Sequence, residues 1–366
     1  MIQHSPLDAQ KLSTAAQRAL GPGPGRMMAA RGIMPLSSGD QVAVLYQLAI
    51  DADAGLAQAA RVTAAGLPEK LLAGTLADPA VDPRVLDFFA GFAAEKAAVF
   101  EAIVLNPATA DPTVATLAAK GGAREVDLIS QNEQRVLRHP EIIAAMYMNR
   151  RARMSTIDRV VELAVRNRVR VPGLAAWDEV ARALTGGASG GKDDAMFEGV
   201  LAAASGDDSP LTAGDPDQVL PEDDDGKLPP ELPFRDLSMP AKIRLATLGN
   251  AFVRATAIRD PSRMVAMAAI KSPGVTDIEA ARYASNRNLV EDVIRYIATK
   301  REWTKLYGVK VSLCRNPKTP IAESTRLLPF LREREIHNLS KSRGVPSALV
   351  AQARKVLMQR RGGSKP

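Results

Sequence analysis

Apolar residues recur at helical spacing along most of the chain. Residues 155–169, STIDRVVELAVRNRV, carry a broad apolar stripe made of Ile157, Val160, Val161, Leu163, Ala164 and Val165. Residues 291–303 carry a second stripe, made of Val293, Ile294, Ile297 and Ala298. Stripes of this period are typical of amphipathic helices, and no run alternates apolar and polar residues with the β-branched content of a sheet. The pattern predicts an all-α protein.

Helix starts are marked by proline and by capping residues. A side-chain acceptor followed by proline suits the N-cap and the first helical position, and this pair occurs at Asp82-Pro83, Asp111-Pro112 and Thr319-Pro320. Thr276 and Glu279 have the spacing of a capping box. Ser155 and Asp158 have the spacing of an N-cap residue and its partner at position N3. We expect a helix to begin at each of these places.

Other prolines mark where helices end, because a proline moves the residue before it out of the α region. These are Pro79, Pro107, Pro273 and Pro317, each about four residues before a start signal. Helices joined by such short connectors fold back side by side, which is the organisation of helical repeats. The stop prolines are unevenly spaced, at 28 residues between the first two and 44 between the last two. We expect degenerate repeats.

The segments LADPAVDPRVL, VLNPATADPTV and LCRNPKTPIAE, each followed by an apolar helix, carry a family resemblance. This punctuation resembles the leucine-rich repeat variant and, more loosely, HEAT-type helical repeats, over residues 70–120 and 258–355. The repeat length is greater than the variant's usual unit. The resemblance implies an α-solenoid of irregular repeats that offers a binding surface, as such folds usually serve as scaffolds. It implies no individual functional residue.

Composition divides the chain into segments. Residues 186–236 are rich in Gly, Ser, Pro and Asp and contain 3 Lys and Arg against 13 Asp and Glu. Too few apolar residues are present to offset the cost of ordering the backbone, so we expect an acidic disordered linker, with a short helix possible at 193–204. The remaining segments are a flexible extension with a short helix at 1–36, helical-repeat lobes at 37–185 and 237–362, and a disordered tail at 363–366.

The charge is polarised between these segments. The net charge is +1 over residues 1–185, −10 over 186–236 and +16 over 237–366, within a total of +7. The strongest feature is the stretch 298–318, where Lys and Arg residues surround Trp303 and Tyr307. Cations mixed with aromatic side chains suit acidic ligands, including nucleic acids. A structural explanation is also open. Lys and Arg near helix C-termini complement the helix dipole, and the two aromatic residues could be part of the core.

Candidate chemistry beyond binding is sparse. Cys314 is the only cysteine and the three histidines are far apart in sequence, so we expect neither an intrachain disulfide nor a Cys- or His-based metal site. GGASGGKD, residues 186–193, has the spacing of a phosphate loop but places Asp193 where Ser or Thr must hold magnesium. The sequence predicts no catalytic residue, metal or cofactor.

The sequence therefore gives function only as a class. The leading hypothesis is a non-catalytic scaffold or adaptor that binds a protein partner, possibly acidic, through the basic C-terminal lobe. The candidate contacts are Arg287, Arg301, Trp303, Lys305, Tyr307, Lys310, Arg315, Lys341 and Arg343. The alternatives are nucleic-acid binding by the same surface and an enzyme whose site is not visible in sequence. A further hypothesis is that the acidic linker folds over the basic lobe and competes with acidic partners for it. No secretion signal or membrane span is visible, so we expect a cytoplasmic protein.

Overall fold

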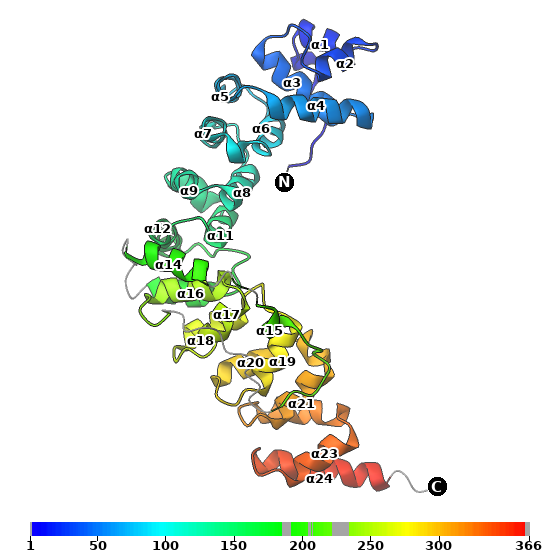
Figure 1. The fold of residues 1–366 in the computed structure, drawn as a ribbon, viewed down its shortest axis with the longest axis vertical. Coiled ribbons are helices and arrows are strands. Elements are labelled where there is room, and N and C mark those ends of the chain that lie inside the picture. The colour runs from blue at the N-terminus through cyan, green and yellow to red at the C-terminus, as the bar shows by residue number, and fades with distance from the viewer. Residues whose placement is uncertain (1, 185–191, 204–205, 207, 222–233, 363–366) are drawn as a thin grey trace. The chain divides into compact units, whose positions relative to one another are not determined.

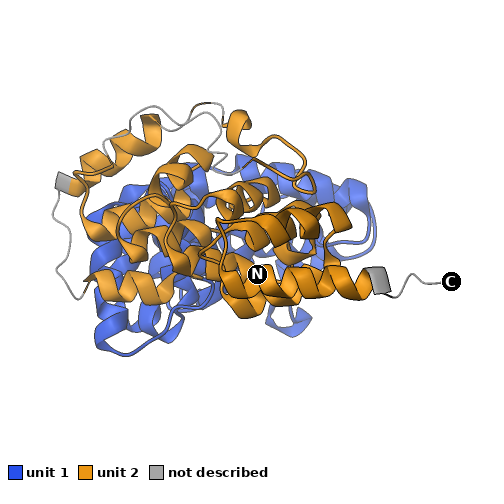
Figure 2. Cartoon of the chain, turned by 90° about the horizontal axis from the view of Figure 1, so that it is seen from below, with its two compact units in different colours: residues 1–173 blue, residues 174–366 orange. Residues whose placement is uncertain are grey.

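The computed structural model confirms the all-α prediction. It describes residues 2–184, 192–203, 206, 208–221 and 234–362, and these contain α-helices and short 3-10 helices but no strand. Among these residues no helix has the length and apolar character needed to cross a membrane. The chain divides into two compact units, residues 1–173 and 174–366, which are coloured separately in Figure 2.

Unit 1 consists of short helices that pair with their neighbours. They are η1 (Ala9–Lys11), α1 (Thr14–Leu20), α2 (Gly25–Ala30), α3 (Ser38–Ala49), α4 (Ala54–Gly66), α5 (Glu69–Leu76), α6 (Pro83–Ala90), η2 (Ala93–Glu95), α7 (Ala97–Leu105), α8 (Asp111–Lys120), α9 (Ala123–Ser130), α10 (Glu133–Arg138), α11 (Glu141–Met148) and α12 (Met154–Arg166). Within the unit, α5, α7, α9 and α12 follow one another in one layer, and α6, α8 and α11 in a second (Figure 1).

The N-terminal segment differs from the flexible extension that we expected. Ala16 and Ala19 of α1 and Ala29 and Ala30 of α2 are buried, because these helices pack on α3 and α4. The Tyr46 hydroxyl also donates a hydrogen bond of 2.9 Å to the carbonyl of Ser5. Small alanine faces permit this close helix packing without a long apolar run, which is why the pattern alone did not indicate it.

Unit 2 is built in the same way. Its helices are α13 (Trp177–Leu184), α14 (Lys192–Ala203), α15 (Ser209–Thr212), α16 (Met239–Leu248), α17 (Ala251–Ala257), α18 (Arg263–Ile270), α19 (Asp277–Ser285), α20 (Glu291–Thr299), η3 (Trp303–Lys305), α21 (Tyr307–Arg315), α22 (Ile321–Leu327), η4 (Leu328–Phe330), α23 (Glu333–Lys341) and α24 (Ser347–Gly362). In Figure 1, α16, α18 and α20 form one layer, and α17, α19, α21 and α23 the other.

The boundary between the units lies earlier than the one expected at residue 185. Helix α13 packs on α16 and α18 of unit 2. Its Glu179 is only 7% exposed, and the ammonium group of Lys271 in unit 2 donates a hydrogen bond of 2.9 Å to the Glu179 carboxylate. An amphipathic helix joins whichever neighbour covers its apolar face, so the composition change after residue 185 did not reveal where unit 2 begins.

Most of the predicted helix boundaries are confirmed. Asp82 caps α6 by accepting from the backbone N–H of Arg84, and Pro83 is the first helical residue. Thr276 and Glu279 form the capping box of α19. The helices before the four stop prolines end two or three residues ahead of them, at Leu76, Leu105, Ile270 and Arg315. Proline and capping chemistry thus determine where these helices begin and end.

Three predicted caps are wrong. Asp111 is the first residue of α8 and not its cap, and its carboxylate instead accepts from Arg138 at 2.7 Å. Thr319 donates its hydroxyl hydrogen to the carbonyl of Leu313, and α22 begins after Pro320. Ser155 lies inside α12, which begins at Met154. A tertiary partner competes for the side chain of Asp111, and a preceding carbonyl competes for that of Thr319.

A buried asparagine at the end of one helix fixes that helix to its neighbour in the same layer. Asn106 follows α7, and its side-chain amide donates to the carbonyls of Leu76 and Asp78 at the end of α5. Its side-chain oxygen accepts from the N–H of Ala108. Asn149 repeats this arrangement between α11 and α8, and Asn316 repeats it between α21 and α19. Carbonyls that a helix end leaves unpaired are satisfied in this way.

The acidic segment 186–236 differs in part from the expected disordered linker. Residues 192–203 form α14, whose Phe197 and Val200 are buried, and the guanidinium of Arg244 lies 4.6 Å from the centre of the Phe197 ring. Residues 208–218 lie against unit 2, and we call them the strap. The phosphate-loop spacing at 186–193 lies mostly outside the described residues, as do 222–233 and the tail 363–366.

Candidate functional site

The strap begins at the N-terminal end of α17. The carboxylate of Asp208 accepts a hydrogen bond of 2.9 Å from the backbone N–H of Ala251, the first residue of that helix. Three residues later Leu211 is 3% exposed and packs with Ala251 and Ala255. An acidic group and one apolar side chain therefore anchor the first part of the strap.

The strap then crosses the N-terminal half of α19. The carbonyl of Ala213 accepts from the guanidinium of Arg282 at 3.3 Å. Gly214 has a φ of +136°, a backbone conformation that favours glycine. A Cβ atom there would lie 3.0 Å from a methyl group of Ile278, the second residue of α19. Glycine at this position thus allows the backbone to turn close to the helix.

The strap ends on the first turn of α21. The carboxylate of Asp217 accepts from the backbone N–H of Tyr307 at 2.7 Å. The next residue of the helix is Gly308, and a Cβ atom there would lie 2.6 Å from the carbonyl oxygen of Pro216 and 2.1 Å from that of Gln218. The backbone of the strap therefore lies directly on this glycine, and only a residue without a side chain fits.

The positions of these contacts explain why the strap is acidic. It touches the starts of α17, α19 and α21, where unpaired N–H groups and the helix dipole favour negative charge. Asp208 and Asp217 serve α17 and α21, while α19 already has Glu279 in its capping box. Carboxylates at these helix starts satisfy donors that the helices cannot pair internally. The strap is thus held as an anionic ligand would be.

Cations and aromatic side chains surround the end of the strap. We call this group the basic patch, and it consists of Lys305, Tyr307, Lys310, Phe330 and Arg332. The Arg332 guanidinium lies 4.6 Å from the centre of the Tyr307 ring, and the Lys310 ammonium 5.9 Å from that of Phe330. Phe330 is 65% exposed. Among the described residues no carboxylate forms a salt bridge with the three cations.

The basic patch is suited to anions because its cations lie near the N-terminal end of α21. Lys310 reaches back to donate to the carbonyl of Lys305 at 2.9 Å, in the connection before α21. Its ammonium group therefore lies near the positive end of the helix dipole, where a cation is unfavourable unless an anion accompanies it. An acidic group bound here gains from both the cations and the helix start.

A second set of predicted residues lies at the opposite ends of the same helices. The guanidinium of Arg287, after α19, donates to the carbonyl of Arg315, the last residue of α21. Arg315 forms a salt bridge with Glu335. Both side chains are half-buried. Cations at helix C-termini are stabilising, so these two residues have structural partners that account for them.

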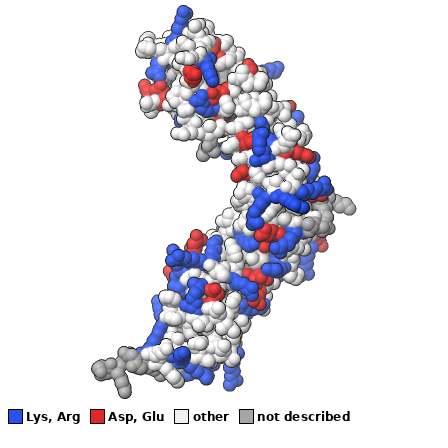
Figure 3. Space-filling model, turned by 180° about the vertical axis from the view of Figure 1, so that it is seen from behind, with Lys and Arg blue, Asp and Glu red and all other residues white. Residues whose placement is uncertain are grey.

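The other predicted residues divide into exposed and buried ones. Arg301, Lys341 and Arg343 are exposed and form no salt bridge with any described residue. Figure 3 shows Lys and Arg over the part of the surface that leads to the C-terminus. Trp303 is 2% exposed, with the Lys300 ammonium 4.0 Å from its ring centre. A partner cannot reach Trp303 without unfolding the unit, so we remove it from the candidate contacts.

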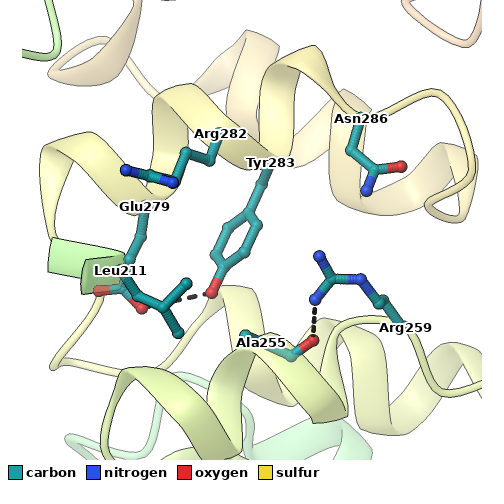
Figure 4. A pocket seen from close by; sticks show the side chains of 7 residues that line it. All are labelled: Leu211, Ala255, Arg259, Glu279, Arg282, Tyr283 and Asn286. Atoms are coloured by element: carbon teal, nitrogen blue, oxygen red, sulfur yellow. Dashed lines mark hydrogen bonds between the residues drawn. The ribbon is translucent and has the colours of Figure 1, made fainter. Parts of the chain in front are cut away.

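Beneath the strap, a small cavity is lined by residues that include Leu211, Glu279 and Tyr283 (Figure 4). The Arg254 guanidinium donates two hydrogen bonds of 2.9 Å to Glu279, and both side chains are almost wholly buried. The Tyr283 hydroxyl also donates to Glu279, and burial raises the pKa of Tyr283. The cavity measures about 10 Å³, which is room for a single water molecule at most.

A larger groove of about 460 Å³ lies in unit 1, between the N-terminal segment, α3 and the connection before α6. Three of its acidic residues already accept hydrogen bonds from the local backbone. Asp8 accepts from the N–H of Gln10, Asp78 from that of Ala80, and Asp82 from Arg84. Among the described residues no three His, Cys, Asp or Glu side chains gather as metal ligands would.

We expect Cys314 to be unreactive in the folded protein. Burial raises the pKa of its thiol to about 12, and the side chain is 0% exposed. Because the thiolate is the nucleophile, a thiol reagent should modify the native chain at pH 8 far more slowly than the chain in urea. The check is the modification rate in both states, and equal rates would contradict the buried position.

No protein-family model, curated protein or solved structure matches the chain.

Proposed function

We propose that the chain is a non-catalytic helical-repeat scaffold of α-solenoid type, which binds an acidic segment of a partner protein on unit 2. The repeat reading is supported by the buried asparagines, since Asn106 and Asn316 link successive helices through the same three hydrogen bonds. A layer of parallel helices places their N-terminal ends in a row, and such rows favour anionic ligands.

The observation that carries this proposal is the strap itself. Unit 2 already holds an acidic peptide, although from its own chain, by the amides of Ala251 and Tyr307. The basic patch at the end of this row adds three cations that have no carboxylate partner among the described residues. Phe330, the exposed aromatic side chain beside them, offers apolar contact. Peptide binding by this surface requires no rearrangement of the helices.

Nucleic-acid binding is the second candidate, and the cations of the basic patch are what favour it. Stacking of bases, however, requires free aromatic faces. Trp303 is buried and Arg332 covers the Tyr307 ring, which leaves Phe330. A peptide ligand is therefore the better match to this surface.

The double substitution Lys305→Glu/Lys310→Glu should weaken binding of an acidic peptide at least tenfold. The probe is a fluorescein-labelled peptide of twelve residues, eight of them Asp or Glu, titrated into the full chain at low salt. Each exposed ion pair contributes about 0.2 to 1 kcal/mol, and reversal replaces attraction by repulsion at two positions. The melting temperature should stay nearly unchanged, because both side chains lie at the surface.

The matched control is Lys70→Glu/Lys120→Glu in unit 1, which changes the net charge equally at two other exposed lysines. Binding that falls equally in the control would show that only overall charge matters, and the proposal would fail. A single-stranded DNA of equal charge provides the second arm. If the DNA binds more tightly than the peptide and loses affinity only in the patch variant, nucleic-acid binding is the function instead.

A further inference from the structure

The strap has the character of a ligand held in its own binding site. Its anchors include two carboxylates on helix amides, one carbonyl on Arg282, and one buried leucine. Its three aspartates form no salt bridge with any described Lys or Arg. Cations of the basic patch therefore lie beside an acidic segment that does not use them. A peptide with additional acidic residues after the last aspartate could gain ion pairs that the strap lacks.

The spacing of the anchors defines a recognition pattern. Asp208 meets the start of α17, Leu211 enters the apolar site between Ala251 and Ala255, and Asp217 meets the start of α21. The pattern is thus an aspartate, a leucine three residues later and a second aspartate six residues after the leucine. Between the first two anchors the chain forms the single helical turn α15, and after it the chain must contain a residue able to turn at the Gly214 position.

We propose that the strap is an intramolecular pseudo-ligand, and that the partner of unit 2 is an acidic peptide with this pattern, which displaces it. This inference rests on the proposed function, because it identifies the ligand of the same surface and how access to it is controlled. A tethered competitor acts at an effective concentration of roughly millimolar. A peptide that binds the surface at micromolar concentration when the strap is absent is therefore excluded while the strap is bound. The peptide displaces the strap when its affinity for the surface, or its concentration, exceeds the affinity or the effective concentration of the strap.

The test uses the full chain and a defined probe, a fluorescent peptide with the sequence of residues 208–221, DSPLTAGDPDQVLP. Two variants weaken the strap without altering the surface below it: Asp217→Ala, and Leu211→Ser/Asp217→Ser. Fluorescence anisotropy should show at least tenfold tighter binding to either variant than to the wild type. The single substitution serves if the double variant fails to fold.

Gly308→Ala provides the test from the surface side. Added to either strap variant, it should abolish binding of the probe, because the new Cβ occupies the place of the carbonyls of Pro216 and Gln218. The matched control is Gly74→Ala in α5, a helical glycine with open space around its Cβ position. Both changes replace glycine by a better helix former, so only Gly308→Ala should affect the probe.

Four results would overturn the inference, and the first three are distinguishable from failure of the proposed function. Equal binding of the probe to the wild type and the strap variants would show that the strap does not occupy the site. Binding that survives Gly308→Ala would place the peptide elsewhere. If the strap variants bind the Asp- and Glu-rich peptide through the basic patch but not the 208–221 probe, the proposed function stands and the strap is structural. If no variant binds either peptide, both proposals fail.

Discussion

Glu279→Ala should reduce the free energy of unfolding by about 3 to 5 kcal/mol, the usual cost of leaving one member of a buried ion pair without its partner. Glu279 receives two hydrogen bonds from Arg254 and one from Tyr283, and it also completes the capping box of α19. Its side chain is 2% exposed, so water cannot replace the lost carboxylate. Urea unfolding followed by circular dichroism measures the change.

Two further variants separate the ion pair from general damage to the helix. Arg254→Met/Glu279→Leu removes both charges together and should recover part of the loss, since no unpaired charge remains buried. Asp292→Ala breaks the surface salt bridge with Arg263, whose side chain is 62% exposed, and should cost less than about 1 kcal/mol. A loss at Glu279 no larger than that at Asp292 would mean that the pair is accessible to water.

Asn316→Ala should cost about 2 to 4 kcal/mol, although the side chain that it removes is small. The Asn316 amide donates to two carbonyls at the end of α19, and its oxygen accepts from the N–H of Lys318. Alanine leaves these groups without a partner in a buried place, and each unsatisfied group costs about 1 to 3 kcal/mol. The loss should appear in urea unfolding as a lower midpoint at an unchanged slope.

Asn288→Ala is the matched control, because Asn288 lies three residues after the end of α19 and its side chain is exposed. Its substitution should change the stability by less than about 0.5 kcal/mol. If Asn316→Ala and Asn288→Ala have the same effect, the buried asparagines do not hold neighbouring helices together, and the common arrangement around Asn106, Asn149 and Asn316 has no energetic role.

Helix boundaries could be predicted from sequence because they are set by local chemistry. Pro83 with Asp82, and Glu279 with Thr276, act on backbone groups within a few residues of themselves. The link between helices could not be predicted in the same way. Asn149 performs the role of Asn106 without a following proline, and its partners lie about thirty residues earlier. The signal that could have indicated it is an asparagine directly after an apolar helix.

The strap escaped the sequence prediction because its composition is polar and acidic. A segment with one buried leucine has too little apolar surface to predict order by composition. What orders it here is the row of helix starts, which exists only after α17, α19 and α21 have packed. The basic stretch, in contrast, was visible in sequence. Within this stretch, the cations of the basic patch near Lys305 differ from those near Arg315, which are paired at helix ends, and only the fold shows this difference.

In this layer of unit 2, acidic groups lie at helix starts and basic groups lie near helix ends. Acidic groups of the strap lie at the starts of α17 and α21, and Arg287 and Arg315 lie near helix ends. Both placements are favoured by the helix dipole. The basic patch departs from this arrangement, since it gathers cations at the start of α21. That departure is the physical reason for expecting an acidic ligand at this place.

Hydrogen exchange at the backbone amide of Tyr307 tests most directly whether the acidic strap occupies the helix starts of unit 2. This N–H has no partner within its helix and donates to Asp217 at 2.7 Å. We expect it to be protected in the wild type and to exchange much faster in Asp217→Ala, while the amide of Lys310, bonded to Leu306 inside the helix, is unchanged. Exchange of the Tyr307 amide at the unprotected rate in the wild type would contradict the account.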